Sequence, residues 1–175
     1  DATGVVAILK AVDWLGRQGV DVVNMSLSGP RNKLLNRGLG RAARNGMVIV
    51  AAAGNDGPDA APRFPAAFPF VLAVTAVDAD LNVYRRAVQG PHIDLAAPGV
   101  DIVVTEQTRS RIFSGTSAAA PFVTAAIAAD PALRGASIEQ VRRTLAGSAR
   151  DLGQPGADPV FGAGLLQAPE GCRVN

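Results

Sequence analysis

The chain has 175 residues, of which 48% are hydrophobic, and its formal net charge at pH 7 is +2. This apolar content excludes a disordered chain, and the length predicts one domain with a buried core. No apolar run approaches the roughly 20 residues that cross a bilayer, and the scattered basic residues favour solvated helix faces over a nucleic-acid-binding surface.

Hydrophobic periodicity divides the chain into helices and strands. In chain order the pattern predicts a helix (5–15), a strand (20–27), a helix (34–42), two strands (47–53 and 70–78), two shorter strands (92–99 and 101–106) and two helices (116–129 and 137–149). Residues 47–53 and 70–78 are almost entirely apolar, as in strands that are buried on both faces. Ser137 is the predicted N-cap of the last helix, with Gln140 as its capping-box partner.

The alternation of buried strands and amphipathic helices predicts an α/β fold with a mainly parallel sheet. In such sheets, ligands gather at the carboxyl ends of the strands. The loops that follow Leu27 and Ala53 begin at these ends, so a ligand is expected beside them.

The stretch SGTSAAAP, residues 114–121, has the features of a nucleophile's setting. Gly115 allows a sharp turn before Ser117, and the free N–H groups of a helix N-terminus favour negative charge beside that serine. The alanines permit close packing against the sheet, and Pro121 is tolerated near a helix start. Taken alone, an ordinary N-cap serine is the more common interpretation.

The stretch AAAGNDG, residues 51–57, is open to similar alternatives. Asn55 follows a buried strand and a glycine, where its carboxamide can donate hydrogen bonds into a cleft, as in an oxyanion hole. A turn asparagine is the common alternative. A phosphate-binding loop is disfavoured, because the sequence contains neither GxxxxGK nor GxGxxG.

In combination and in this order, these segments resemble those of the subtilases, the subtilisin-like serine peptidases. GTSAAAP resembles the family's nucleophile motif, VIVAAAGNDG its oxyanion strand and loop, and DVVNMSLSGP its substrate-binding strand, while IDLAAPG and FGAGLLQA resemble two further segments. The resemblance implies a three-layer fold in which helices flank a mainly parallel sheet. Residues 1–175 would form the C-terminal part of a single peptidase domain, without its N-terminal strands.

The resemblance further implies that Ser117 is the nucleophile, and that its backbone N–H and the Asn55 side chain hold the oxyanion. The substrate backbone would pair with an edge strand. Two segments would flank the primary specificity pocket, namely Ser26, Leu27, Ser28, Ala52, Ala53 and Gly54. Ser28 stands where a glycine is common and would narrow the pocket. Arg63 is expected on the surface, the alternative being a place near the pocket floor with a preference for acidic side chains.

The family's catalytic Asp and His have no counterpart here. In subtilisin both precede the serine by more than about 150 residues, whereas 116 residues precede Ser117. Asp1 is not expected to be the catalytic acid, because Ala2 breaks the family's Asp-Thr-Gly spacing. The single histidine, His92, is not followed by Gly-Thr and is expected to be structural. Asp94 is expected to be a turn residue, the alternative being a calcium ligand.

We therefore expect a segment of a serine endopeptidase that forms an acyl-enzyme on Ser117 and is inactive in isolation. The expected partners are a polypeptide substrate and the upstream half of the same domain, with no cofactor, nucleic acid or membrane. The strand over 20–27 would expose a long apolar edge that invites homodimerisation. The alternative is a non-catalytic peptide-binding or self-associating pseudoprotease module. The resemblance to the family implies a secreted or extracytoplasmic protein, although no signal peptide opens the chain.

Overall fold

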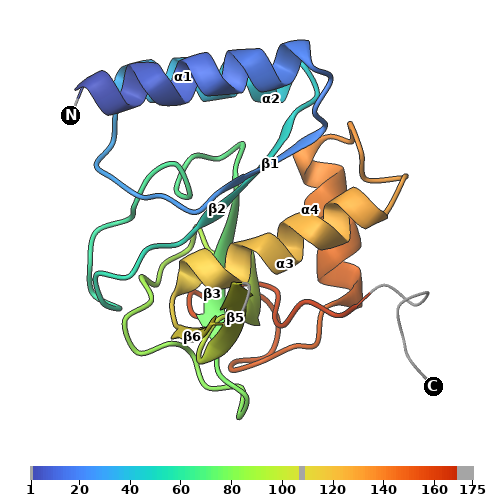
Figure 1. The fold of residues 1–175 in the computed structure, drawn as a ribbon. Coiled ribbons are helices and arrows are strands. Elements are labelled where there is room, and N and C mark those ends of the chain that lie inside the picture. Colours follow the sequence, from blue (N-terminus) through green and yellow to red (C-terminus); the bar gives the residue numbers. More distant parts are fainter. Residues whose placement is uncertain (1, 107–108, 169–175) are drawn as a thin grey trace.

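A computed structural model describes residues 2–106 and 109–168 of the chain, and its centre is a sheet of four parallel strands (Figure 1). In sequence and in space their order is β1 (Val22–Met25), β2 (Val48–Ala52), β3 (Leu72–Val77) and β4 (Leu95–Pro98). The predicted α/β fold with a mainly parallel sheet is confirmed. Because β1 and β2 are parallel neighbours, the loops that follow them leave the same edge of the sheet side by side.

Helices cover both faces of the sheet, which makes three layers (Figure 1). One face carries α1 (Ala2–Arg17) and α2 (Lys33–Arg44), and the other carries α3 (Thr116–Ala129) and α4 (Ile138–Ser148).

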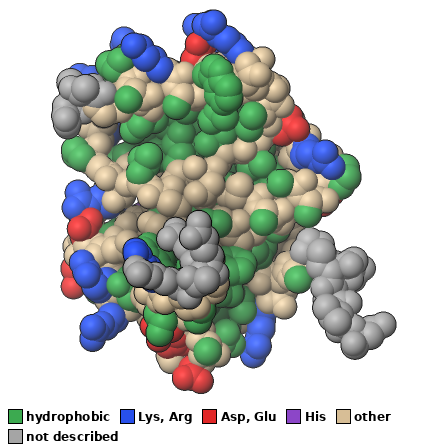
Figure 2. Space-filling model, viewed as in Figure 1, with side chains coloured by type: hydrophobic (Ala, Val, Ile, Leu, Met, Phe, Trp, Pro, Cys, Tyr) green, Lys and Arg blue, Asp and Glu red, His purple; other side chains and the backbone are tan. Residues whose placement is uncertain are grey.

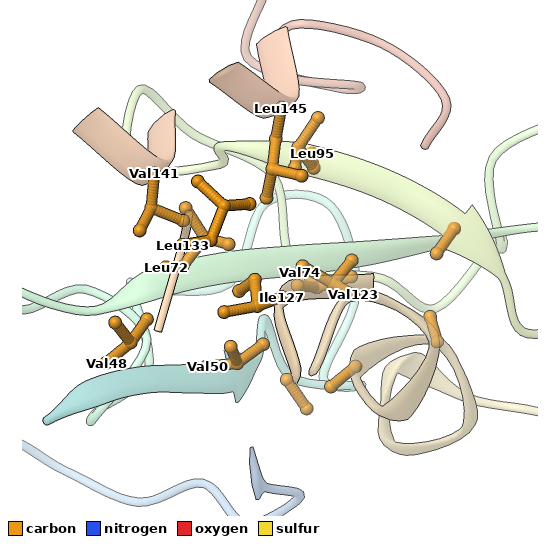
Figure 3. Packing of buried hydrophobic residues seen from close by; sticks show 14 of the residues in the cluster. Val48, Val50, Leu72, Val74, Leu95, Val123, Ile127, Leu133, Val141 and Leu145 are labelled. Atoms are coloured by element: carbon orange, nitrogen blue, oxygen red, sulfur yellow. The ribbon is translucent and has the colours of Figure 1, made fainter. Parts of the chain in front are cut away.

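Successive side chains of a strand point to opposite faces, so β2 serves both layers of helices. Val48 and Val50 belong to the core beneath α3 and α4, whereas Ile49 belongs to the core beneath α1 and α2. Figure 3 shows the first of these cores, in which side chains of the sheet meet Val123 and Ile127 of α3.

The helix bounds follow local sequence signals. The bounds of α3 are those predicted, and Ser137 caps α4 as predicted by accepting a hydrogen bond from the Gln140 N–H at 3.3 Å. The predicted apolar face of α1 is wrong at Trp14, whose side chain is 60% exposed. At 100° per residue Trp14 points away from the helix face that contacts the core, which is formed by Val5, Ile8, Leu9, Val12 and Leu15.

The two edges of the sheet differ. A C-terminal segment covers the outer side of β4, where Ala96 N–H donates to the Gly164 carbonyl at 2.9 Å and Leu166 N–H donates to the Ala96 carbonyl at 2.8 Å. Within residues 2–106 and 109–168, no strand pairs with the outer side of β1. The edge is open as expected but only four residues long, because the chain turns away after Met25 to form an isolated bridge between Gly29 and Phe64.

The structure has two paired strands where the sequence predicts a single short strand over 101–106. β5 (Ile102–Glu106) pairs in antiparallel fashion with β6 (Arg109–Phe113). Prediction missed β6 because three of its five residues are Arg or Ser, types that give no apolar strand pattern.

On the face of the molecule in Figure 2, Lys and Arg side chains are scattered around the margin. In the described part of the chain, no helix has the length and apolar character to cross a bilayer.

Candidate active site

Ser117 lies in the first turn of α3, at the carboxyl end of the sheet. The helix begins at Thr116 after the N-cap Gly115, whose φ of 155° gives the predicted sharp turn. A side chain on Gly115 would place its Cβ 3.2 Å from Nδ2 of Asn55, so glycine also permits this close approach. Ser117 is therefore the second residue of the helix, and the alternative of an ordinary N-cap serine is wrong.

The polar atoms of Ser117 are available for chemistry. Among residues 2–106 and 109–168, neither its backbone N–H nor its hydroxyl donates a hydrogen bond. The side chain is partly exposed. The free N–H groups at the start of a 14-residue helix favour negative charge at this point.

Asn55 is held against the same turn by Thr116. Its Oδ1 accepts hydrogen bonds from the Thr116 N–H at 3.0 Å and from the Thr116 hydroxyl at 3.1 Å. Because a backbone N–H only donates, the carbonyl side of the carboxamide faces Thr116, and the Nδ2 side is left free to donate elsewhere. This arrangement orients Asn55 before any ligand binds.

Thr116 is part of the candidate site, although the sequence suggests no separate role for it. Its side chain is fully buried, and its hydroxyl also accepts a hydrogen bond from Gly54 N–H at 3.1 Å. One hydroxyl therefore links the loop after β2 to the start of α3. The signal in the sequence is the threonine directly before the serine, which is too short a pattern to reveal a partner 62 residues away.

The carbonyl of Ser117 is held from outside the helix. Pro121 lies four residues later and has no N–H, so α3 cannot supply the usual donor to this carbonyl. The hydroxyl of Ser26, which follows β1, donates to it instead at 2.9 Å. The Asn24 side chain in turn donates to the Ser26 hydroxyl at 2.9 Å. Ser26 thus ties the start of α3 to the end of β1.

The two predicted pocket segments lie next to each other. Ala52, Ala53 and Gly54 are buried at the end of β2. The segment Ser26–Ser28 is exposed after the neighbouring strand β1. A separate cavity of about 640 Å³ lies at the opposite, amino ends of β1 and β2, beside Asp21 and Met47, and none of the predicted site residues lines it.

The Arg63 side chain is partly exposed, in keeping with the favoured expectation of a surface position, and it also contacts the second pocket segment. A Cβ added to Gly54 would come within 2.9 Å of the Arg63 Cγ and 3.3 Å of its Cβ, so the stem of Arg63 packs on Gly54. The Arg63 Nε donates to Oδ2 of Asp56 at 2.6 Å. The arginine is therefore part of the wall behind the second pocket segment.

His92 and Asp94 lie at the amino end of β4, away from Ser117. Both ring nitrogens of His92 are buried and have no hydrogen-bond partner in the described residues. Burial lowers the pKa of His92, and the nearby Asp94 carboxylate opposes this shift. At about 3.3 Å per residue, β4 separates residue 94 from residue 99 by roughly 16 Å, and Gly99 is the residue that contacts the turn before Ser117.

Both carboxylate oxygens of Asp94 are occupied by protein donors. Oδ1 accepts from Nε of Arg142 at 2.8 Å, and Oδ2 accepts from Ala73 N–H at 2.7 Å. Arg142 also donates to two backbone carbonyls, those of Pro69 and Val71. Within the described part of the chain, no three His, Cys, Asp or Glu side chains gather as a metal site would require. Asp1, which is not expected to be the catalytic acid, lies outside the described residues.

Comparison with known proteins identifies the family of this chain. The family model for the Subtilase family matches residues 2–164. Subtilisin DY of Bacillus licheniformis is 35% identical over 169 residues, which are 91% of this chain and 60% of that protein. The minor extracellular protease Epr of Bacillus subtilis is 33% identical over 168 residues, covering 92% of this chain and 25% of its own length.

A solved structure is also similar in fold. Fervidolysin from Fervidobacterium pennivorans, described as a keratinolytic enzyme related to subtilisin, superposes with a TM-score of 0.83 at 25% identity. The match covers 93% of this chain and 28% of fervidolysin. The chain thus spans between a quarter and two thirds of the length of each of these three relatives.

Proposed function

This chain belongs to the subtilase family, and we propose that it supplies the nucleophile, the oxyanion hole and one side of the substrate site of a serine endopeptidase. The observation that carries the proposal is the anchoring of Asn55. Thr116 occupies its Oδ1, and Nδ2 lies against Gly115, two residues before Ser117. Neither Nδ2 nor the Ser117 N–H has a hydrogen-bond partner among the described residues. Two fixed donors next to an unpaired serine hydroxyl are what acyl transfer requires.

In the proposed reaction the Ser117 Oγ attacks the carbonyl carbon of the scissile peptide bond and loses its proton to a base. The carbonyl oxygen becomes an oxyanion, which accepts hydrogen bonds from Ser117 N–H and Asn55 Nδ2. The C–N bond then breaks, the amine leaves with a proton from the base, and the acyl group stays on Oγ. Water hydrolyses this ester, which releases a carboxylic acid and restores the serine.

The base and its orienting acid are proposed to come from a part of the protein outside this sequence. His92 is the one histidine of the sequence, and it lies at the far end of β4. A serine hydroxyl without a base is a weak nucleophile at neutral pH. We therefore expect the isolated chain to have little activity.

The open edge of β1 is the proposed junction with that other part of the domain. Its backbone N–H and C=O groups need partners, and a further strand would supply them. Pairing between two copies through the same edge is the competing outcome, and light scattering over a range of concentrations distinguishes a dimer from a monomer. The extracellular relative named above supports an extracytoplasmic location for this protein as well.

No metal is proposed at Asp94, because its oxygens already bind Arg142 and the Ala73 N–H. A calcium ion there would have to displace the guanidinium. We expect calcium to leave the thermal unfolding midpoint unchanged relative to magnesium, because a ligand that does not bind the folded state does not stabilise it. A calcium-specific rise that Asp94→Asn abolishes would contradict this assignment.

A fluorophosphonate probe that reacts with activated serines tests the proposed function. The full-length protein should be labelled, the label should map to Ser117, and Ser117→Ala should remove it. Asn55→Ala should slow peptide hydrolysis by about 10²–10³, a magnitude carried over from subtilisin itself. Full-length protein that stays unlabelled would refute the peptidase proposal, and strong labelling of the isolated chain would refute the proposed need for an external base.

A further inference from the structure

We infer that Arg63 closes the far end of the specificity pocket and selects substrates with a carboxylate on the residue whose carbonyl is attacked. This inference rests on the proposed function, since it names the substrate class of the same site. It assigns a role to a side chain that the catalytic steps do not use.

The position of Arg63 follows from two contacts, one on each pocket segment. Its stem packs on Gly54, where an added Cβ would lie 2.9 Å from the Arg63 Cγ. The next residue, Phe64, forms a bridge with Gly29, in which Gly29 N–H donates to the Phe64 carbonyl at 2.8 Å and Phe64 N–H donates to the Gly29 carbonyl at 3.0 Å. Gly29 directly follows the segment Ser26–Ser28. The Arg63–Phe64 dipeptide therefore spans the space between the two segments.

The backbone beneath Arg63 is fixed. The Phe64 ring packs on Phe68, with ring centroids 4.7 Å apart, and Phe68 is buried in the core beneath α1 and α2. The Arg63 carbonyl accepts a hydrogen bond from Ala67 N–H at 2.9 Å. An arginine on a fixed backbone loses less conformational entropy when it binds a ligand than one on a mobile loop.

The guanidinium of Arg63 retains the donors that a carboxylate needs. Its Nε is occupied by Asp56 at 2.6 Å, and the two terminal nitrogens have no partner in residues 2–106 and 109–168. These two nitrogens form the fork that binds a carboxylate through two parallel hydrogen bonds. Asp56 holds the other side of the group, so it orients the fork rather than blocking it.

Asp56 also limits the expected selectivity. The ion pair is partly exposed, with 34% of the Arg63 side chain and 44% of the Asp56 side chain accessible. Solvent therefore screens the electrostatic attraction between either charge and a substrate side chain. A substrate lysine that binds Asp56 is the rival outcome. Because the arginine is the less exposed partner and the one that packs on Gly54, we expect it to set the preference.

Peptide substrates that differ only at the residue before the scissile bond test this inference. With full-length protein whose Ser117 reacts with the fluorophosphonate, we expect kcat/KM for glutamate to exceed that for glutamine by about tenfold at low salt. Arg63→Gln should bring the ratio close to one. Arg37→Gln, on the exposed face of α2, is the matched control and should leave the ratio unchanged.

The outcomes separate this inference from the proposed function. Suppose that a labelled enzyme has the same kcat/KM, or a higher one, for glutamine, leucine or lysine substrates than for the glutamate substrate. This result would overturn the role of Arg63 and leave the peptidase proposal intact. A glutamate preference that survives Arg63→Gln would overturn it as well. A protein that is not labelled at Ser117 would overturn both proposals.

Discussion

Replacing Thr116 by valine removes one buried hydroxyl and keeps the shape of the side chain. The hydroxyl accepts from Gly54 N–H at 3.1 Å and donates to Asn55 Oδ1 at 3.1 Å. Valine can do neither. The Thr116 N–H still holds the Asn55 carbonyl at 3.0 Å, so the variant weakens the anchor without releasing it.

The magnitude follows from these two bonds. The lost bond to Asn55 contributes about 1 kcal/mol, and leaving the buried Gly54 N–H without an acceptor costs about 1–3 kcal/mol. The expected loss in the free energy of unfolding is therefore about 2–4 kcal/mol. For a chain of this size each kcal/mol lowers the thermal midpoint by about 2–4 °C, so a fall of roughly 10 °C is expected.

Urea denaturation followed by circular dichroism measures this loss, and Thr124→Val on the same helix is the matched control. The Thr124 hydroxyl donates to the carbonyl four residues back at 3.0 Å, and its removal leaves no buried donor unsatisfied. We expect the control to lose less than about 1 kcal/mol. If Thr116→Val were no less stable than Thr124→Val, the Thr116 hydroxyl would not link the two segments.

Three further changes test other contacts. Ser26→Ala should lower kcat by about tenfold and change KM less, because the Ser117 carbonyl loses its hydrogen-bond donor. Arg142→Met should cost about 2–3 kcal/mol in urea denaturation, because Asp94 is left partly buried without its cation. Arg17→Met is the control, because the Arg17 side chain, which pairs with Asp13, is 75% exposed, and it should cost under about 1 kcal/mol. Stability should fall as the pH drops below about 6.5, the ordinary pKa of histidine, because burial of its ring nitrogens lowers the pKa of His92 in the folded state and the unfolded chain then binds a proton more readily. His92→Phe should reduce this fall.

Each of these expectations can fail on its own. Unchanged kinetics of Ser26→Ala would show that α3 holds the serine without help from β1. If Arg142→Met and Arg17→Met lowered the free energy of unfolding equally, the ion pair of Arg142 would contribute no more than an exposed one. A pH dependence that is the same with and without His92 would assign the acid sensitivity to other groups.

The sequence predicts the sheet and α3 well, because the signals are local. Valine-rich runs are buried on both faces in β2 and β3, and the turn at Gly115 starts α3 where expected. Trp14 was misplaced because an apolar residue inside a helical pattern need not face the core. The hairpin of β5 and β6 was missed because its second strand owes its formation to pairing with the first strand rather than to composition.

The candidate site could be predicted as a set of residues but not as a network. Asn55 and Ser117 are marked by short motifs. The hydrogen bonds that orient them come from Thr116 and Ser26, which join segments 61 and 91 residues apart. No local pattern records such partners. The contact of Arg63 with Gly54 could not be predicted for the same reason, since it depends on the path of the loop between them.

Pro121 determines which part of the fold holds the Ser117 carbonyl. Because Pro121 has no N–H, the Ser117 carbonyl is held not by α3 but by Ser26, just beyond the open edge strand β1. A shift of β1 would therefore move that support and change the alignment of Ser117. A strand that pairs with this edge would therefore also restrain Ser26 and, through its hydrogen bond, the Ser117 carbonyl.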